Sequence, residues 1–242
     1  MAAARTDLDR PGSVLAIYAH PDDAEISAGG TLARWAREGA EVRLLVCTRG
    51  DKGSQDPQAD PDALTAVRRE ETQRSADLLG FAAVEHLDHP DGELVNDTGL
   101  RSQLVAAVRR HRPDAVVCPD PTAVFFGDRY YNHRDHRELG FAVLDAVSPA
   151  AGNPHYFRDQ LGDGLEVHRV GDVYLSGTLE PNCWVDVSAT IEAKIDALFA
   201  HASQLEATGE WFRQFLRDRA EDAGRQAGVP SAEAFRRLTF AG

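Results

Sequence analysis

Short apolar runs alternate with longer amphipathic stretches along most of the chain. The apolar runs predict buried strands at Val14–Ala19, Val42–Thr48, Val84–Leu87 and Ala115–Cys118. Helical spacing between and after them predicts helices over Ile26–Glu38, Pro61–Leu79, Leu100–Arg110 and Asp135–Val147. Strands that alternate with helices form βαβ units. The expected fold is therefore α/β, a three-layer Rossmann-like fold with a mainly parallel sheet flanked by helices.

The C-terminal third has a weaker pattern. Glu166–Val170 and Val173–Thr178 are expected to be strands that extend the sheet, and Ala189–Leu205 is expected to be a helix. The charged segment from Glu210 to Leu238 is interpreted as helical. Since no repeat or linker is visible, we expect a single domain over residues 1–242.

Composition narrows the classes of partner. Acidic residues outnumber basic ones by 39 to 26, a net charge of −13, which disfavours nucleic acid and anionic membranes as partners. No run approaches the roughly 18 apolar residues of a spanning helix. Residues 1–14 lack the apolar core of a signal peptide. The three cysteines are Cys47, Cys118 and Cys183. They are widely spaced, form no disulfide framework and are expected to be buried as small hydrophobic residues. A cytoplasmic protein is therefore expected.

Polar residues follow the first predicted strand in the order His20, Pro21, Asp22, Asp23. Ligands of open parallel sheets bind outside the carboxyl ends of the strands. A turn there can aim the imidazole of His20 and the carboxylate of Asp23 at one point, and a cation would relieve the repulsion between the two aspartates. The alternative is that one aspartate only caps the following helix, but a cap explains neither His20 nor the pair.

A second cluster, Tyr130–His136, follows the fourth predicted strand and reads YYNHRDH. One of His133 and His136 can be a metal ligand while the other faces the substrate. Asp135 can accept a hydrogen bond from His133 and fix its tautomer. Taken alone, the segment is equally well explained as a solvated, charged helix start.

The two clusters are expected at the same edge of the sheet, where they offer two imidazoles and a carboxylate. Three protein ligands with the fourth position left for water are typical of a catalytic zinc site.

Several segments carry a family resemblance. AHPDDAEISAGGTLARWAREG (19–39), VRLLVCTRGDKG (42–53) and NHRDH (132–136) resemble the LmbE / GlcNAc-phosphatidylinositol de-N-acetylase (PIG-L) family of zinc-dependent deacetylases. The resemblance runs from about Val14 to about Gln204 and includes LDHPDGEL, PNCWVDVS and KIDALFAHASQ. One departure is that Ala24 separates the aspartate pair from Glu25, which leaves no defined role for that glutamate.

The resemblance implies a hydrolase that removes an N-acetyl group from an N-acetylated sugar or related small molecule, with one Zn²⁺ per chain. It implies zinc on His20, Asp23 and His136 and a general base at Asp22. It further implies that His133, with Asp135 behind it, stabilises the oxyanion or protonates the leaving amine. Arg68 and Tyr131 match substrate-binding positions; otherwise they are a surface charge and a packing tyrosine.

Other functions compete with this interpretation. Within metal-dependent amide hydrolysis, the alternative is a mycothiol- or bacillithiol-type conjugate amidase. A metal- or sugar-binding protein without activity would not require a base beside the metal. A phosphoesterase usually needs more ligands, and a nucleotide-binding protein would need the GxGxxG that is missing after the first strand. Substrate specificity is expected to depend on three loops, Asp51–Asp62, Asp120–Arg129 and Gly152–Gly164. The sequence leaves open whether the protein forms a homo-oligomer.

Overall fold

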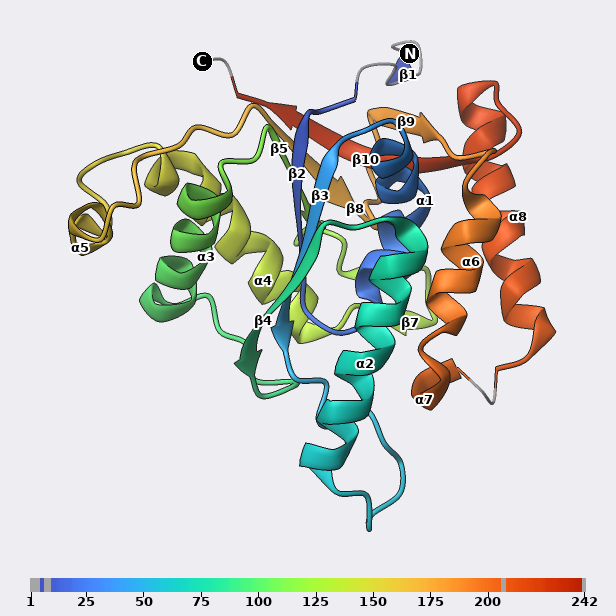
Figure 1. Cartoon of the computed structure of the whole chain (residues 1–242). Coiled ribbons are helices and arrows are strands. Elements are labelled where there is room, and N and C mark those ends of the chain that lie inside the picture. Colours follow the sequence, from blue (N-terminus) through green and yellow to red (C-terminus); the bar gives the residue numbers. More distant parts are fainter. Residues whose placement is uncertain (1–4, 7–9, 206–207, 241–242) are drawn as a thin grey trace.

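The structure, a computed structural model, describes residues 5–6, 10–205 and 208–240. Its centre is an eight-stranded sheet in the order β1-β9-β10-β8-β5-β2-β3-β4 (Figure 1). The strands are β1 (Arg5–Thr6), β2 (Ser13–Tyr18), β3 (Glu41–Thr48), β4 (Ala83–His89), β5 (Ala115–Pro119), β8 (Asp172–Ser176), β9 (Cys183–Asp186) and β10 (Ala232–Thr239). All pairs are parallel except those of β10, which runs antiparallel to β8 and β9.

Helices cover both faces of the sheet (Figure 1). One face carries α3 (Thr98–His111) and α4 (Arg134–Asp145), and the other carries α1 (Asp23–Arg37) with α2 (Pro61–Leu79). On that side α6 (Ile191–Phe199) packs against α1 and α2, and α8 (Glu210–Ala227) packs against β9, β10 and α6; two short helices are α5 (Arg158–Gly162) and α7 (Ala202–Leu205). This confirms the predicted three-layer α/β fold with a mainly parallel sheet.

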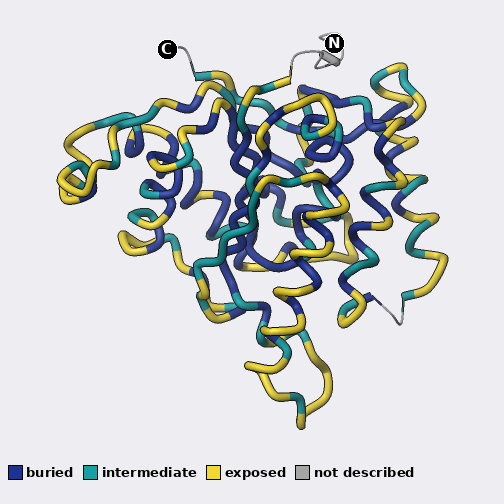
Figure 2. Tube along the Cα trace, viewed as in Figure 1, coloured by how far each residue is buried: buried dark blue, intermediate teal, exposed yellow. Residues whose placement is uncertain are grey.

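The core follows the alternation of side chains along β2. Leu15 and Ile17 face α3 and α4, whereas Val14 and Ala16 face α1, because successive side chains of a strand point to opposite sides. Both faces are apolar since both are covered by helices. Figure 2 shows the central strands buried, while the loop before α2 is exposed.

The strand order reverses between β2 and β5. From β2 the chain proceeds to β3 and β4 on one side, and β5 and β8 lie on the other. A crevice opens at such a switch point, outside the carboxyl ends of the strands. The polar clusters that follow β2 and β5 therefore meet there.

Two C-terminal expectations were wrong. Glu166–Val170 forms no strand, and Glu210–Leu238 is not one helix but α8 followed by β10. The helix ends because Gly228 adopts a left-handed conformation with φ 74°, and Pro230 then prevents it from resuming. β10 completes the sheet by inserting between β8 and β9, and β9 itself was not predicted.

Smaller differences concern element ends. The helix expected over Asp135–Val147 is α4, and the chain after it, Ala146–Ala151, is kinked at Ser148, whose φ −140° and ψ 119° are not helical. Ala189–Leu205 is divided into α6 and α7. A small hairpin, β6 (Phe125–Phe126) and β7 (Tyr130–Tyr131), was also not predicted. None of the helices in the described part of the chain combines the length and apolar content that crossing a membrane requires.

Candidate active site

The turn after β2 places the first predicted cluster at the switch point. The Nδ1 atom of His20 lies 3.2 Å from Oδ2 of Asp23, and the same oxygen accepts a hydrogen bond from the His20 backbone N–H at 2.8 Å. Asp22, between them, has φ 94° and caps no N–H of α1 with its side chain. A left-handed conformation is costly for a residue other than glycine and is often kept at functional sites. The capping interpretation is therefore wrong for Asp22.

The second cluster reaches the same point from the start of α4. Nε2 of His136 lies 3.2 Å from Nδ1 of His20 and 3.2 Å from Oδ1 of Asp23. On its other side, the Nδ1–H of His136 donates to Oδ1 of Asn132 at 2.9 Å, and the Asn132 amide donates to the carbonyl of Ala123 at 2.8 Å. Asn132 thereby fixes the tautomer that leaves the Nε2 lone pair facing His20 and Asp23.

The three groups fit a tetrahedral metal ion. Nδ1 of His20 and Nε2 of His136 lie 3.2 Å apart, and each lies 3.2 Å from a carboxylate oxygen of Asp23, Oδ2 for His20 and Oδ1 for His136. Zinc bonds of about 2.0–2.1 Å in tetrahedral geometry place neighbouring ligand atoms about 3.3 Å apart. Two imidazole lone pairs directed at each other and at a carboxylate are unfavourable alone and become favourable around a cation. The donor set of His20, Asp23 and His136 can therefore hold a metal ion.

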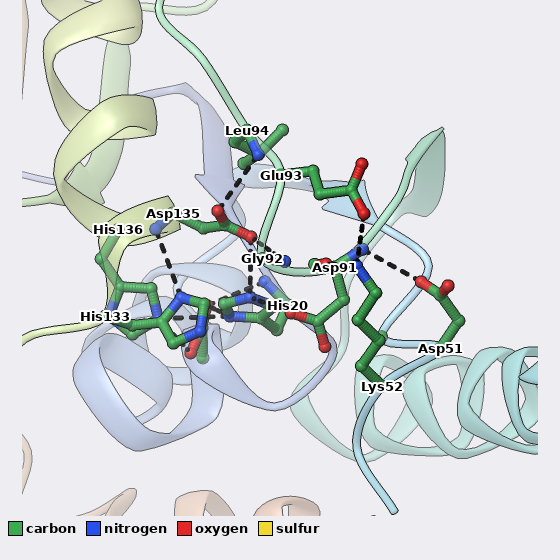
Figure 3. Close-up of polar contacts among 12 residues, drawn as sticks. His20, Asp51, Lys52, Asp91, Gly92, Glu93, Leu94, His133, Asp135 and His136 are labelled. Atoms are coloured by element: carbon green, nitrogen blue, oxygen red, sulfur yellow. Dashed lines mark hydrogen bonds and ion pairs between the residues drawn. The ribbon is translucent and has the colours of Figure 1, made fainter.

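The other nitrogen of His20 faces two carboxylates (Figure 3). Its Nε2 lies 3.3 Å from Oδ2 of Asp135 and 3.1 Å from Oδ1 of Asp91. Asp135 is fully buried and accepts backbone N–H groups from Gly92 at 2.7 Å and Leu94 at 3.1 Å. The carboxylate of Asp135 thus orients His20, a common arrangement behind a metal-ligating histidine.

This contact corrects the expected pairing of Asp135 with His133. Only the backbone N–H of Asp135 reaches that imidazole, donating to its Nδ1 at 3.2 Å, because His133 caps α4. Burial, together with the nearby His20, lowers the pKa of His133. The expected side-chain hydrogen bond from His133 to the Asp135 carboxylate is therefore not formed. With Nδ1 accepting, the neutral ring carries its proton on Nε2.

Further candidate ligands surround the same histidine. One ligand atom each from His20, His133 and His136 lie within 4.8 Å of one another, and so do those of His20, Asp91 and Asp135. The carboxylate of Asp135 already accepts two N–H groups, and His133 is exposed. Asp91 follows β4 in the segment LDHPDGEL, and its position just after a strand was the signal that the sequence reasoning missed.

Electrostatics at the cluster reflect its many carboxylates. Burial lowers the pKa of His20, but the carboxylates of Asp23, Asp135 and Asp91 outweigh it and raise this pKa to about 12. Burial also opposes the ionised form of Asp23, but His136 and His20 hold its pKa well below the usual range. The site therefore favours positive charge at its centre.

Arg68 stands behind Asp22 and is not a surface charge. The residue is 3% exposed, and its guanidinium donates to the carbonyls of Pro21 at 2.7 Å and Gly50 at 3.0 Å and to Oδ2 of Asp22 at 3.2 Å. Gly50 is required there, since a Cβ would lie 2.5 Å from an Arg68 nitrogen and φ is +63°. Burial raises the pKa of Asp22 to about 7, and Arg68 counteracts it. The surface-charge interpretation of Arg68 is wrong, and its contact with substrate stays a prediction.

Glu25 also has a defined place. It is fully buried, accepts a hydrogen bond from the Ser75 hydroxyl, and lies 3.5 Å from Nε2 of the equally buried His201. Burial lowers the pKa of His201, but the carboxylate of Glu25 outweighs it and raises the pKa overall. This pair lies on the side of α1 that faces α2, where Glu25 is close in sequence to Asp22 and Asp23.

A cavity of about 570 Å³ opens beside the metal-ligand cluster. Asp23 and His136 line it together with Tyr130, Asn132 and Asp120, which the sequence reasoning did not single out. Tyr131 instead is 56% exposed, and its ring lies against Phe125 and Arg137. Among the described residues that line this cavity, the tyrosines are Tyr18 and Tyr130. A role of Tyr131 in substrate binding stays a prediction.

Fold and site together define a class: a three-layer α/β protein with a His/Asp cluster at the carboxyl edge of its sheet that can hold a metal ion. The chain belongs to the GlcNAc-PI de-N-acetylase family, PIG-L, which it matches over residues 15–147, more than half of its length. The predicted resemblance is thereby confirmed.

Individual relatives extend the similarity over most of the chain. Diacetylchitobiose deacetylase of Thermococcus kodakarensis is 37% identical over 224 residues, which cover 92% of this chain and 82% of the relative. The N,N'-diacetylchitobiose deacetylase of Pyrococcus horikoshii, solved with its inhibitor MPG, is 33% identical with a TM-score of 0.86, covering 95% of this chain and 84% of that one. A 1D-myo-inositol 2-acetamido-2-deoxy-alpha-D-glucopyranoside deacetylase of Kineococcus radiotolerans is 32% identical over 60% of this chain and 47% of the relative.

Proposed function

We propose that this chain is a zinc-dependent hydrolase that removes the acetyl group from an N-acetylated sugar. The observation that carries the proposal is the meeting of His20, Asp23 and His136, with both imidazole nitrogens 3.2 Å from each other and from an Asp23 oxygen, and with Asp22 preceding Asp23 in the same turn. The relatives support the substrate class, since they are named as deacetylases of diacetylchitobiose and of an N-acetylglucosaminyl inositol.

In this proposal one zinc ion binds Nδ1 of His20, the carboxylate of Asp23 and Nε2 of His136. A bound zinc ion supplies Lewis-acid polarisation of the amide carbonyl and makes water nucleophilic near neutral pH. Asp135 and Asn132 hold the two imidazoles in the tautomers that ligation requires.

Asp22 acts as the general base. It accepts a proton from the water that attacks the amide carbonyl, and its backbone strain and the Arg68 guanidinium keep its carboxylate in place. The cap contact of His133 leaves an Nε2–H that donates to the oxyanion as it develops. The amine leaves after taking a proton, and both Asp22 and His133 are candidates to supply it.

The relatives leave two kinds of acetylated sugar open. One is an N-acetylated chitobiose-type disaccharide and the other an N-acetylglucosaminyl inositol, the substrate of a mycothiol-type pathway enzyme. Both present a 2-acetamido sugar whose amide can reach the same cluster. Cleavage of a thiol conjugate is the related alternative, and a panel of N-acetylated sugars and conjugates separates them by the amine released.

The test is a set of variants assayed for amine release and for zinc content. Asp22→Asn is expected to bind zinc but to lose about 10²–10⁴-fold in kcat, the usual contribution of a general base. His136→Ala is expected to lose zinc, and His133→Ala to lower kcat with zinc retained. The control is Asp88→Asn, because Asp88 also has a positive φ, 62°, but lies at the end of β4 against Arg69.

Wild-type turnover by fully zinc-loaded Asp22→Asn would contradict the base assignment. Loss of metal in His133→Ala with metal retained in His136→Ala would mean that the two histidines have exchanged roles. If the zinc-loaded wild type released no amine from any N-acetylated sugar, a metal-binding protein without this activity would be the better description.

A further inference from the structure

Part of the cavity lining comes from α8, in a part of the chain where the sequence offered no functional signal. Phe215 and Arg219 of this helix line the same cavity as Asp23 and His136. They are four residues apart and so lie on one face of the helix. The intervening Leu216, with Ala220, is buried and fixes α8 against the rest of the molecule.

Aromatic side chains flank this cavity on two sides. Phe126 and Tyr130 come from the β6–β7 hairpin, and Phe215 comes from α8. Tyr130 is 53% and Phe215 47% exposed, although large apolar rings are usually covered. The Phe215 ring is held in place by stacking on Phe212, with centroids 5.9 Å apart and an interplanar angle of 10°. These rings form a fixed apolar rim around a polar site, which is typical of a ligand pocket.

Arg219 supplies charge at the same rim. Within the described part of the chain, its guanidinium is exposed and takes part in no hydrogen bond or ion pair, unlike Arg213 and Arg217 on the same helix. Its donors are therefore available to a ligand, and a guanidinium presents them in a planar fork suited to paired oxygens.

A second cavity of about 240 Å³ adjoins the first. It is also lined by residues of α8, and five residues line both cavities: Ile26, Ser27, Gly177, Thr178 and Arg219. Asp23 and His136 line only the larger cavity. The two cavities thus adjoin, and Arg219 is among the residues between them.

We infer that Phe215 and Arg219 form a distal binding site for a second polyhydroxylated ring of the substrate, so that the enzyme selects acetylated sugars with a ring attached over free N-acetylglucosamine. This inference rests on the proposed function. The aromatic rim packs against the apolar face of the second ring, and Arg219 donates to its hydroxyl oxygens. The second ring can be a sugar or a cyclitol, and the two share this chemistry.

The test compares kcat/KM for N-acetylglucosamine, N,N'-diacetylchitobiose and the N-acetylglucosaminyl inositol, with amine release as the readout. In the wild type, at least one two-ring substrate is expected to exceed the monosaccharide by about tenfold or more, the value of one charge-assisted hydrogen bond. Which of the two exceeds it distinguishes a sugar from a cyclitol as the second ring. Arg219→Ala is expected to remove most of this preference, and Phe215→Ala about three- to tenfold of it, while kcat/KM for the monosaccharide changes little.

Arg225→Ala is the matched control, since Arg225 is an exposed arginine of α8 that lines neither cavity. Its ratio of two-ring to monosaccharide kcat/KM is expected to equal that of the wild type. A wild-type ratio within twofold of one for both two-ring substrates would overturn the inference without any variant. So would an unchanged ratio in both Arg219→Ala and Phe215→Ala. Zinc-loaded wild type that cleaves none of the three sugars would instead overturn the proposed function.

Discussion

Asn132 is expected to control metal affinity although its side chain is not placed to bind the metal. Its Oδ1 accepts the Nδ1–H of His136 at 2.9 Å, its amide donates to the Ala123 carbonyl at 2.8 Å, and the residue is only 6% exposed. In Asn132→Ala the imidazole can rotate or shift its proton to Nε2, and a protonated Nε2 cannot be a ligand.

Loss of such a supporting hydrogen bond usually weakens metal binding about 10–100-fold, which corresponds to about 1.4–2.7 kcal/mol of binding free energy. The zinc dissociation constant is measured by competition with a chelating dye on metal-free protein. Thermal unfolding of the metal-free form separates this effect from a general loss of stability.

Asn182→Ala is the matched control. The Asn182 side chain also makes two hydrogen bonds, both with the backbone of Arg237: its amide donates to the carbonyl, and its Oδ1 accepts the N–H. It lies next to β9, beside the antiparallel pair of β9 and β10. Zinc affinity of Asn132→Ala within twofold of wild type would refute the argument that this amide sets the tautomer of His136. Equal weakening in Asn182→Ala would show that the effect comes from the fold.

Two further predictions concern the core. Lys194 and Glu233 form a buried pair at 2.6 Å, and Lys194→Met leaves the carboxylate without its cation. The free energy of unfolding should fall by about 3–5 kcal/mol and Tm by roughly 6–20 °C. A fall in Tm below 3 °C, or an equal fall in the exposed control Lys52→Met, would contradict this prediction. Burial raises the pKa of the Cys47 and Cys118 thiols well above the usual range, so at pH 8 neither should react with Ellman's reagent until the protein is unfolded, and rapid labelling of native protein would show that they are accessible.

The sequence predicted the parallel part of the sheet because each of its strands is covered on both faces. Such strands appear as continuous apolar runs, as at Val14–Ala19 and Val42–Thr48. β10 gave no comparable signal: it contains Glu233 among its buried residues and follows a helix with little more than a turn between them. Its neighbours in the sheet are distant in sequence, so only the tertiary structure shows why a strand forms there.

The sequence likewise predicted one part of the candidate site and missed another. The spacing of His20 and Asp23 predicted one cluster, and the chain pattern predicted that it would meet the second at one sheet edge. The sequence could not predict which carboxylate contacts which imidazole. Asp135 is adjacent to His136 in the chain, but the backbone N–H groups of the loop after β4 turn its carboxylate toward His20. That choice depends on the path of a loop some forty residues away.

The backbone conformation of Asp22 links the fold to the chemistry. Its φ of 94° is unfavourable for aspartate, whereas glycine at the same position would relieve the strain. The strain is maintained by the fixed contacts on both sides: Asp23 is held by His20 and His136, and Arg68 binds both the Pro21 carbonyl and the Asp22 carboxylate. The same contacts aim two successive carboxylates in different directions, that of Asp23 at His20 and His136 and that of Asp22 at the Arg68 guanidinium. In the proposed reaction, that division separates the residue that binds the metal from the residue that takes the proton.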